Sequence, residues 1–222
     1  MAFSPLDLLF PRRCFGCGKA GVYFCPSCTA KIKVLEKQIC PVCGRPAVLG
    51  RTHPSCRNSL NLDGLISIFV YEKPVREAIK ALKYRFVSDL AQSLVGIASV
   101  YFKIPVEEGI VVPIPLSSQR KRWRGFNQAE VLGKTFARKN NLGFNHKVVE
   151  RVVNNQPQVG LSGKERKKNV KGIFRVVDRR LIKKKTLIIF DDVWTTGATL
   201  KSCGEVLKRE GADEVWGLTL AR

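Results

Sequence analysis

From residue 61 onward, short apolar runs alternate with stretches in which apolar residues recur at helical spacing. The run at 186–190 is almost wholly apolar, as expected of a central strand in a parallel sheet. Strands that alternate with helices predict an α/β fold with a parallel, doubly wound sheet and helices on both faces. The predicted strands span 65–71, 110–114, 147–153, 186–190 and 214–220. One predicted helix begins at Pro74, and three others span 89–102, 126–138 and 198–209.

The N-terminal region follows a different pattern, in which cysteines recur in pairs. Seven of the eight cysteines lie between Cys14 and Cys56, and the composition changes at about 57–64. We therefore expect two domains, 1–60 and 61–222. The first residues carry Asp7 within an apolar stretch and have no basic start, which is unlike an export signal. Cysteine pairs without an export signal favour metal binding over disulfides.

The cysteine pairs form two halves of a repeat, in which His53 stands where the first half has a cysteine. Each half offers four ligands of the types that close a tetrahedral site around Zn²⁺, so we expect two structural zinc ions. Sequential quartets are favoured over a cross-braced pairing. Buried or disulfide-bonded cysteines and a surface-loop His53 are the alternatives. The predicted ligands are Cys14, Cys17, Cys25, Cys28, Cys40, Cys43, His53 and Cys56.

Charge narrows the possible partners. The formal net charge is +21, and the segment 120–185 alone contains 20 basic and 4 acidic residues, net +16. Such an excess favours phosphate-bearing ligands or nucleic acid, although the run at 179–185 is equally consistent with a solvated surface. No stretch approaches the roughly 20 apolar residues of a membrane-spanning helix, so we expect no membrane insertion and a cytoplasmic protein.

The segment 188–199, IIFDDVWTTGAT, joins an apolar strand to a Thr/Gly loop and then to a helix. Backbone N–H groups and threonine hydroxyls at the start of a helix suit a phosphate monoester. The preceding carboxylates of Asp191 and Asp192 repel phosphate but can accept hydrogen bonds from sugar hydroxyls. The pattern predicts a receptor for a ribose 5-phosphate. An ordinary strand end with a capped helix is the alternative.

This segment resembles the phosphoribosyl pyrophosphate (PRPP) motif of type I phosphoribosyltransferases, with Trp194 where an aliphatic residue is usual. The resemblance implies a phosphoribosyltransferase-like fold for 61–222. It also implies that the two acids contact the ribose 2′ and 3′ hydroxyls, that the loop holds the 5′-phosphate, and that Mg²⁺ arrives bound to PRPP. The implied PRPP-binding residues are Asp191, Asp192, Thr195, Thr196, Gly197, Ala198 and Thr199.

The chain as a whole resembles the competence protein F (ComF) family. The likeness rests on Pro113-Ile114-Pro115, on 124–128 (RGFNQ), on 80–84 (KALKY), on the PRPP-like segment and on the paired cysteines. It implies an N-terminal double zinc ribbon over 1–60 and a role in natural transformation, in which incoming single-stranded DNA is handled in the cytoplasm. Components of the DNA-uptake machinery are then the expected protein partners.

Basic residues after the predicted strand 110–114 and within 164–171 suit the neutralisation of a departing pyrophosphate. Trp123 interleaves with arginines and is a candidate for stacking on a base. Phe126 has the spacing of a core residue. The candidate catalytic residues are Arg120, Arg124, Lys164 and Arg166.

Two functions are consistent with this sequence. The zinc region, residues 1–60, allows a third, in which it serves as an interaction module of a regulatory protein. A metabolic phosphoribosyltransferase with an unknown acceptor requires only the PRPP-like segment. A PRPP-binding competence factor that also binds single-stranded DNA additionally accounts for the zinc pairs and for the surplus of basic charge. We favour the second function; whether it includes enzymatic turnover is open.

Overall fold

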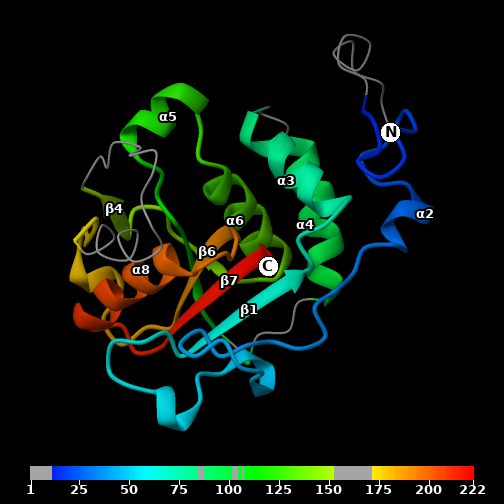
Figure 1. Ribbon diagram of the computed structural model, residues 1–222. Helices are drawn as coiled ribbons and strands as arrows, with labels where there is room; N and C mark the ends of the chain where they lie inside the picture. Colours follow the sequence, from blue (N-terminus) through cyan, green and yellow to red (C-terminus); the bar gives the residue numbers. More distant parts are fainter. Residues whose placement is uncertain (1–11, 85–87, 102–104, 107, 153–171) are drawn as a thin grey trace, which may run out of the picture.

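The computed structural model describes residues 12–84, 88–101, 105–106, 108–152 and 172–222 (Figure 1). Its centre is a five-stranded sheet in which every pair of neighbouring strands is parallel. The strand order is β1-β7-β6-β2-β3. The bounds are β1 Gly64–Phe69, β2 Ile110–Pro113, β3 Gly143–Phe144, β6 Leu187–Val193 and β7 Val215–Ala221.

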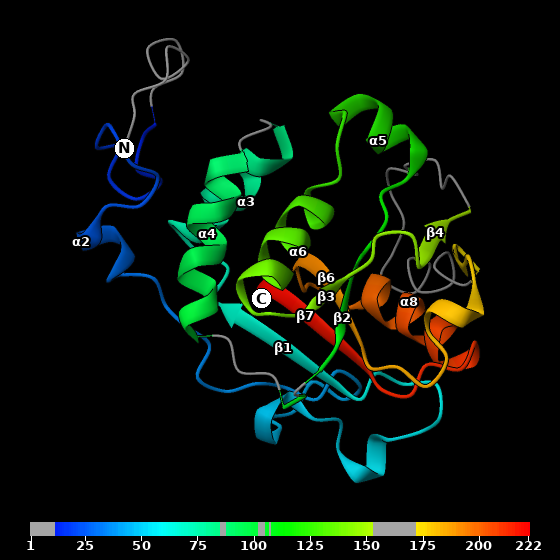
Figure 2. The same ribbon diagram turned by 180° about the vertical axis from the view of Figure 1, so that it is seen from behind.

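Helices cover both faces of the sheet, as the turned view in Figure 2 also shows. Alternation along β6 sends Ile188 and Phe190 to one face and Leu187 and Ile189 to the other, and all four side chains are buried. The first face packs against α3, α4 and α6, and the second against α8. The bounds are α3 Val75–Tyr84, α4 Ser88–Tyr101, α6 Gln128–Lys139 and α8 Ala198–Arg209.

The predicted doubly wound parallel sheet is confirmed, but one predicted strand was wrongly assigned to it. Within 147–153, β4 (Val149–Arg151) pairs antiparallel with β5 (Phe174–Val176) in a separate two-stranded sheet. Val149 and Phe174 of this small sheet are buried in the α8-side core. A buried strand has the same sequence pattern whichever sheet it joins, so the pattern could not separate the two cases.

A second difference concerns the residues that follow β2. The structure forms α5 (Ser118–Arg124) there, in a stretch for which the sequence pattern predicted neither a helix nor a strand. Ser117 accepts a hydrogen bond from the Arg120 backbone N–H, and Gly125 ends the helix at φ 74°. None of its residues is buried, so it lacks the apolar stripe on which the prediction of helices depends. The next helix starts at Gln128 because Asn127 caps it, which leaves Phe126 in the turn before it.

The zinc region lies along one side of the sheet and contains short elements only. Arg12 and Tyr23, in its first half, both contact Asp89 of α4. Residues 33–38 then follow the outer side of β1, where the Leu35 N–H donates to the Ile68 carbonyl and the Gln38 side chain bonds both backbone groups of Ser67. The short elements are α2 Pro26–Thr29, η1 Val48–Gly50 and η2 Pro54–Cys56, with η3 Arg179–Leu181 elsewhere in the chain.

None of the helices in the described ranges is long and apolar enough to cross a membrane.

Candidate functional site

The central strand β6 and its neighbour β2 define the candidate site. The chain leaves β2 toward α6 and β3 on one side, and leaves β6 toward α8 and β7 on the other. The connections therefore diverge above the pair formed by Pro113 and Phe190. In open α/β sheets, ligands bind in the crevice that opens at such a point, outside the carboxyl ends of the strands.

The acid pair stands at this crevice, within the last part of β6. Asp192 is buried, and its Oδ2 lies 2.9 Å from Nζ of Lys83, which comes from α3. The other carboxyl, Asp191, has its pKa raised to about 7 by burial and by the neighbouring negative charge of Asp192. One acid is thus held by a lysine, whereas the other is a carboxyl whose charge is poorly compensated by the protein alone.

The Thr/Gly loop follows directly and encloses a small hollow of about 30 Å³, lined by Asp191 and by residues 193–200. Trp194 is buried beneath the loop, and Lys201 of α8 places its Nζ 5.4 Å from the centre of the indole ring. Gly197 has φ 71° and passes so close to this ring that a Cβ would lie 2.1 Å from it. The indole therefore lies so close to the backbone at this position that only a glycine fits without a steric clash.

We expect Gly197→Ala to destabilise the fold by about 3 kcal/mol or more, since the left-handed backbone costs about 1–2 kcal/mol and the methyl group must displace the indole. Gly211→Ala is the matched control, because Gly211 has φ 99° and nothing within 4 Å of an added Cβ. Urea unfolding of both variants measures the difference. Equal losses of unfolding free energy would contradict the role given to Trp194.

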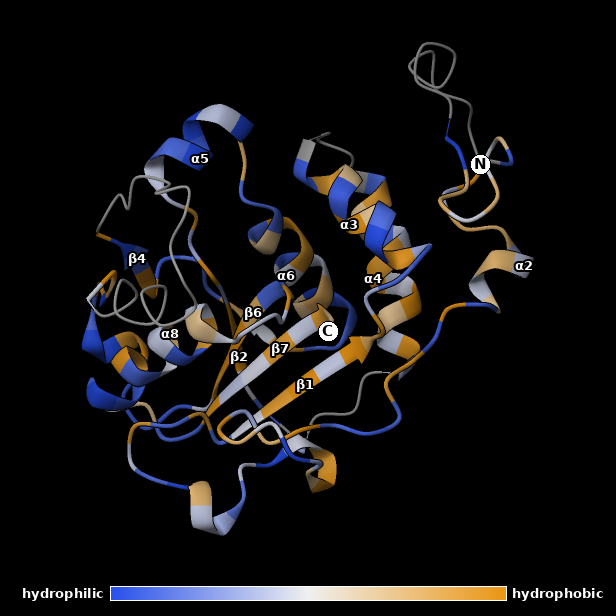
Figure 3. Ribbon diagram, in the orientation of Figure 1, coloured by the Kyte–Doolittle hydropathy of each residue, from blue (hydrophilic) through white to orange (hydrophobic). Residues whose placement is uncertain are grey.

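The basic helix α5 stands above the same edge of the sheet, and Figure 3 shows it as largely hydrophilic. Trp123 is 69% exposed, and the Arg124 guanidinium lies 5.9 Å from its ring. Arg124 also donates to Gln128 Oε1 at 3.0 Å. Arg120 is exposed, and its charge helps to lower the pKa of Arg151 on β4, after the larger effect of burial.

The structure thus brings together some of the predicted residues and adds two. Lys83 contacts Asp192 directly, and the charge of Asp191 favours the charged form of Arg151 on β4. Lys83 and Arg151 were missed as site residues, although Lys83 stands in the segment 80–84 that carried part of the family resemblance. The candidate residues Lys164 and Arg166 lie outside the described residues, as does the rest of 153–171.

The eight predicted metal ligands gather into two sequential quartets, Cys14–Cys17–Cys25–Cys28 and Cys40–Cys43–His53–Cys56, with all ligand atoms of each within 4.8 Å of one another. Zinc–sulfur bonds of about 2.3 Å in a tetrahedron place sulfur atoms about 3.8 Å apart. Cys17 Sγ and Cys25 Sγ are 3.7 Å apart. Both quartets therefore fit a structural zinc ion.

The orientation of the His53 ring suits a metal ligand, because a backbone carbonyl lies beside one of its two nitrogens. Its Nδ1 lies 3.4 Å from Cys43 Sγ, while Nε2 lies 3.0 Å from the carbonyl oxygen of Pro46. A proton on Nε2 can be donated to that carbonyl, which leaves the Nδ1 lone pair for the metal. The arrangement supports a histidine ligand where the first quartet has a cysteine.

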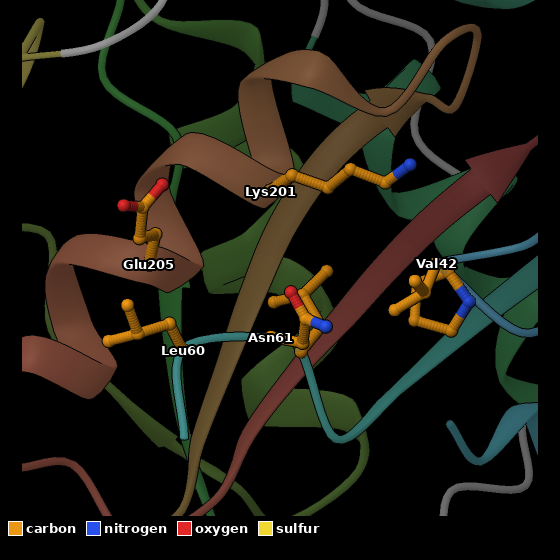
Figure 4. Close-up of a pocket in the computed structure, with 7 residues that line it drawn as sticks. Val42, Leu60, Asn61, Lys201 and Glu205 are labelled. Atoms are coloured by element: carbon orange, nitrogen blue, oxygen red, sulfur yellow. The ribbon is translucent and has the colours of Figure 1, made fainter. Parts of the chain in front are cut away.

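The second quartet also packs toward the loop of the candidate site. Pro41 and Val42, which lie between its first two cysteines, line a cavity of about 140 Å³ together with Lys201 and Glu205 of α8 (Figure 4). Lys201 is the residue whose Nζ lies over Trp194. Lys201 therefore lines the cavity beside the second quartet and also lies over the indole beneath the Thr/Gly loop.

Known proteins resemble the chain along nearly its whole length. Residues 5–59 match the double zinc ribbon domain. Competence protein ComFC of Bacillus subtilis is 31% identical, covering 89% of this chain and 83% of its own length, and competence protein F of Haemophilus influenzae is 30% identical, covering 96% and 98%. The DNA utilization protein YhgH of Escherichia coli is 29% identical, covering 87% and 88%.

A solved structure, described as the allosteric regulatory enzyme of purine biosynthesis, aligns with 60% of this chain and 24% of its own, at 20% identity and a TM-score of 0.37. The double zinc ribbon match agrees with the paired metal quartets. By its identity with ComFC over most of both chains, this chain belongs to the competence protein F family.

Proposed function

We propose that this chain binds PRPP, or a related ribose 5-phosphate, at the carboxyl ends of β6 and β2, and that it binds single-stranded DNA through α5. It would act in the cytoplasm during DNA uptake. The observation that carries the proposal is the position of the exposed basic helix above the same sheet edge as the acid pair and the Thr/Gly loop.

For the sugar phosphate, the support is chemical complementarity. The carboxylates of Asp191 and Asp192 can accept hydrogen bonds from the ribose diol, and residues 195–199 offer backbone N–H groups and hydroxyls for the 5′-phosphate. Arg120 and Arg124 would neutralise the pyrophosphate, whose two phosphates suit the fork of a guanidinium. Mg²⁺, bound with PRPP, would supply further positive charge to the pyrophosphate.

For single-stranded DNA, the support is the surface of α5. A largely exposed indole beside a guanidinium offers a stacking platform next to a phosphate contact, which is how sequence-tolerant proteins hold single strands. The names of the relatives, competence protein and DNA utilization protein, agree with a nucleic-acid ligand.

We expect salt-sensitive binding of an oligodeoxycytidine, because each phosphate contact releases counterions and lowers log K by about 0.7 per tenfold rise in salt. Trp123→Ala should weaken this binding by about 1–3 kcal/mol without changing its salt dependence. Arg122→Gln should instead make the salt dependence shallower. Fluorescence anisotropy over a salt series measures both effects.

Trp123→Phe serves as the control, since it keeps an aromatic face and should keep most of the affinity. Absence of binding at about 50 mM salt, where phosphate contacts are strong, would rule out the DNA part of the proposal. If Trp123→Ala keeps its affinity for the oligonucleotide, the single-stranded DNA does not bind at α5.

A further inference from the structure

A second cavity lies beside the candidate site and shares none of its lining residues with the Thr/Gly loop. It has a volume of about 430 Å³ and opens between α5, the start of α6, and β4. Its apolar surface comes from Pro113 at the end of β2, from Pro115 and Leu116 after it, from Val149 of β4, and from Val177, which follows β5. Cavities of this size, with apolar walls and a few convergent polar groups, are typical of small-molecule sites.

Three cationic side chains converge on this cavity: Lys121 from α5, Lys147 from the loop before β4, and Arg151 at the end of β4. None of them forms an ion pair with an acid in the described part of the chain. Of the two acids in the lining, Glu150 pairs at 2.5 Å with Arg175, which lies outside it, and Glu130 lies 4.0 Å from His146, which also lines the cavity. With the Glu130 carboxylate counted, the three cations still leave the cavity with an excess of positive charge.

Arg151 is the best-defined of these cations. Its guanidinium lies 5.8 Å from the ring of Phe174, its neighbour across the β4–β5 pair, which fixes its direction. Its Nε is buried without a hydrogen-bond partner in the described structure. Burial, and then the charge of Arg120, lower the pKa of Arg151. A partly desolvated cation that meets another cation is stabilised when an anion occupies the space beside it.

We propose that this cavity binds a nucleotide, with its phosphate on Lys121, Lys147 and Arg151 and its base against the proline and valine wall. The phosphate matches the excess of positive charge, and a planar base matches the apolar surface. The nucleotide is either a free mononucleotide or one unit of a strand that also contacts α5. The choice of a nucleotide rests on the proposed DNA binding, whereas the anionic character of the ligand rests on the cavity alone.

The test is calorimetry at low salt with dCMP, deoxycytidine and inorganic pyrophosphate as separate probes. We expect dCMP to bind, deoxycytidine to bind at least about tenfold more weakly, and Lys147→Gln and Arg151→Gln each to weaken dCMP by about tenfold or more, since a charge-assisted contact is worth about 1.5–3 kcal/mol. Lys185→Gln, an exposed lysine before the amino end of β6, is the matched control and should bind dCMP normally.

An oligodeoxycytidine distinguishes the two sources of the nucleotide. If the Lys147 and Arg151 variants weaken both dCMP and the oligonucleotide, the cavity belongs to the DNA path; if they weaken dCMP alone, it holds a free nucleotide. Lys147 is exposed, so its variant keeps the test valid even if Arg151→Gln fails to fold.

Three results would overturn the proposal: dCMP that does not bind, dCMP that binds equally well to the folded Lys147 and control variants, or dCMP whose binding disappears when Asp191 and Asp192 are replaced. In the last case dCMP occupies the sugar-phosphate site. If the wild-type chain binds dCMP but does not bind PRPP or the oligonucleotide, the result counts against the proposed function. The assignment of the cavity to a nucleotide then still holds.

Discussion

The double variant Asp191→Ala, Asp192→Ala is expected to lose PRPP binding by about two orders of magnitude or more while it keeps its affinity for single-stranded DNA. Hydrogen bonds to charged groups are worth about 1.5–3 kcal/mol each, and both ribose acceptors are removed together. The DNA surface proposed on α5 contains neither acid. Calorimetry of PRPP–Mg²⁺ and anisotropy with an oligonucleotide, on the same preparation, measure the two affinities.

This variant also raises the net charge by two and leaves Lys83 without its contact to Asp192. A matched control is Glu36→Ala, Asp213→Ala, which removes two exposed carboxylates away from the crevice and changes the charge equally. It should bind PRPP normally. If the folded Asp191, Asp192 variant loses DNA as well, the two ligands share one site. If it still binds PRPP normally, the carboxylates are not the receptor for the diol.

Removal of zinc is expected to unfold residues 12–57 while the parallel sheet stays folded. The three buried cysteines of the first quartet form a hydrophobic cluster of their own, and the other apolar residues at its start, which pack against the core of the sheet, are only partly buried, so little would hold this segment folded without the ions. The sheet keeps two extensive cores that do not depend on metal. Limited proteolysis before and after treatment with a chelator, together with the stoichiometry of released zinc, measures the effect.

Cysteine variants show which quartet each ion occupies. Cys43→Ser should lower the bound zinc from two ions to one, because it removes a ligand of the second quartet. Cys203→Ala should keep both ions, because Cys203 is buried in the α8 face of the sheet and stands apart from either quartet. Unchanged proteolysis of the segment after metal removal would show that the ribbons fold without zinc.

Local sequence pattern was sufficient for those parts of the fold that have strong periodicity or a fixed spacing. The helix 198–209 was predicted with its observed bounds, and the apolar run before Asp191 forms a central strand. The two clusters of candidate metal ligands were predictable because paired cysteines at short spacing encode their own geometry. In these cases the residues that determine the structure are neighbours in the chain.

The remainder depends on contacts between distant residues. No pattern in 118–124 distinguishes an exposed helix from a loop, and the partner of β4 lies in β5, beyond a long intervening segment. Lys83 contacts Asp192 from α3, and Arg151 of β4 is electrostatically coupled to Asp191, and only the fold relates these distant residues to the end of β6. The motif 188–199 by itself therefore could not predict the site residues that other elements contribute.

The segment between the two zinc quartets covers the β1 edge of the central sheet. Residues 33–38 occupy the outer hydrogen-bonding groups of β1, a strand whose residues are all buried. An uncovered strand of this kind is a template for pairing with another chain. Zinc loss would free that edge, so self-association and aggregation should accompany depletion of the metal. We therefore expect the metal sites to help keep the protein monodisperse.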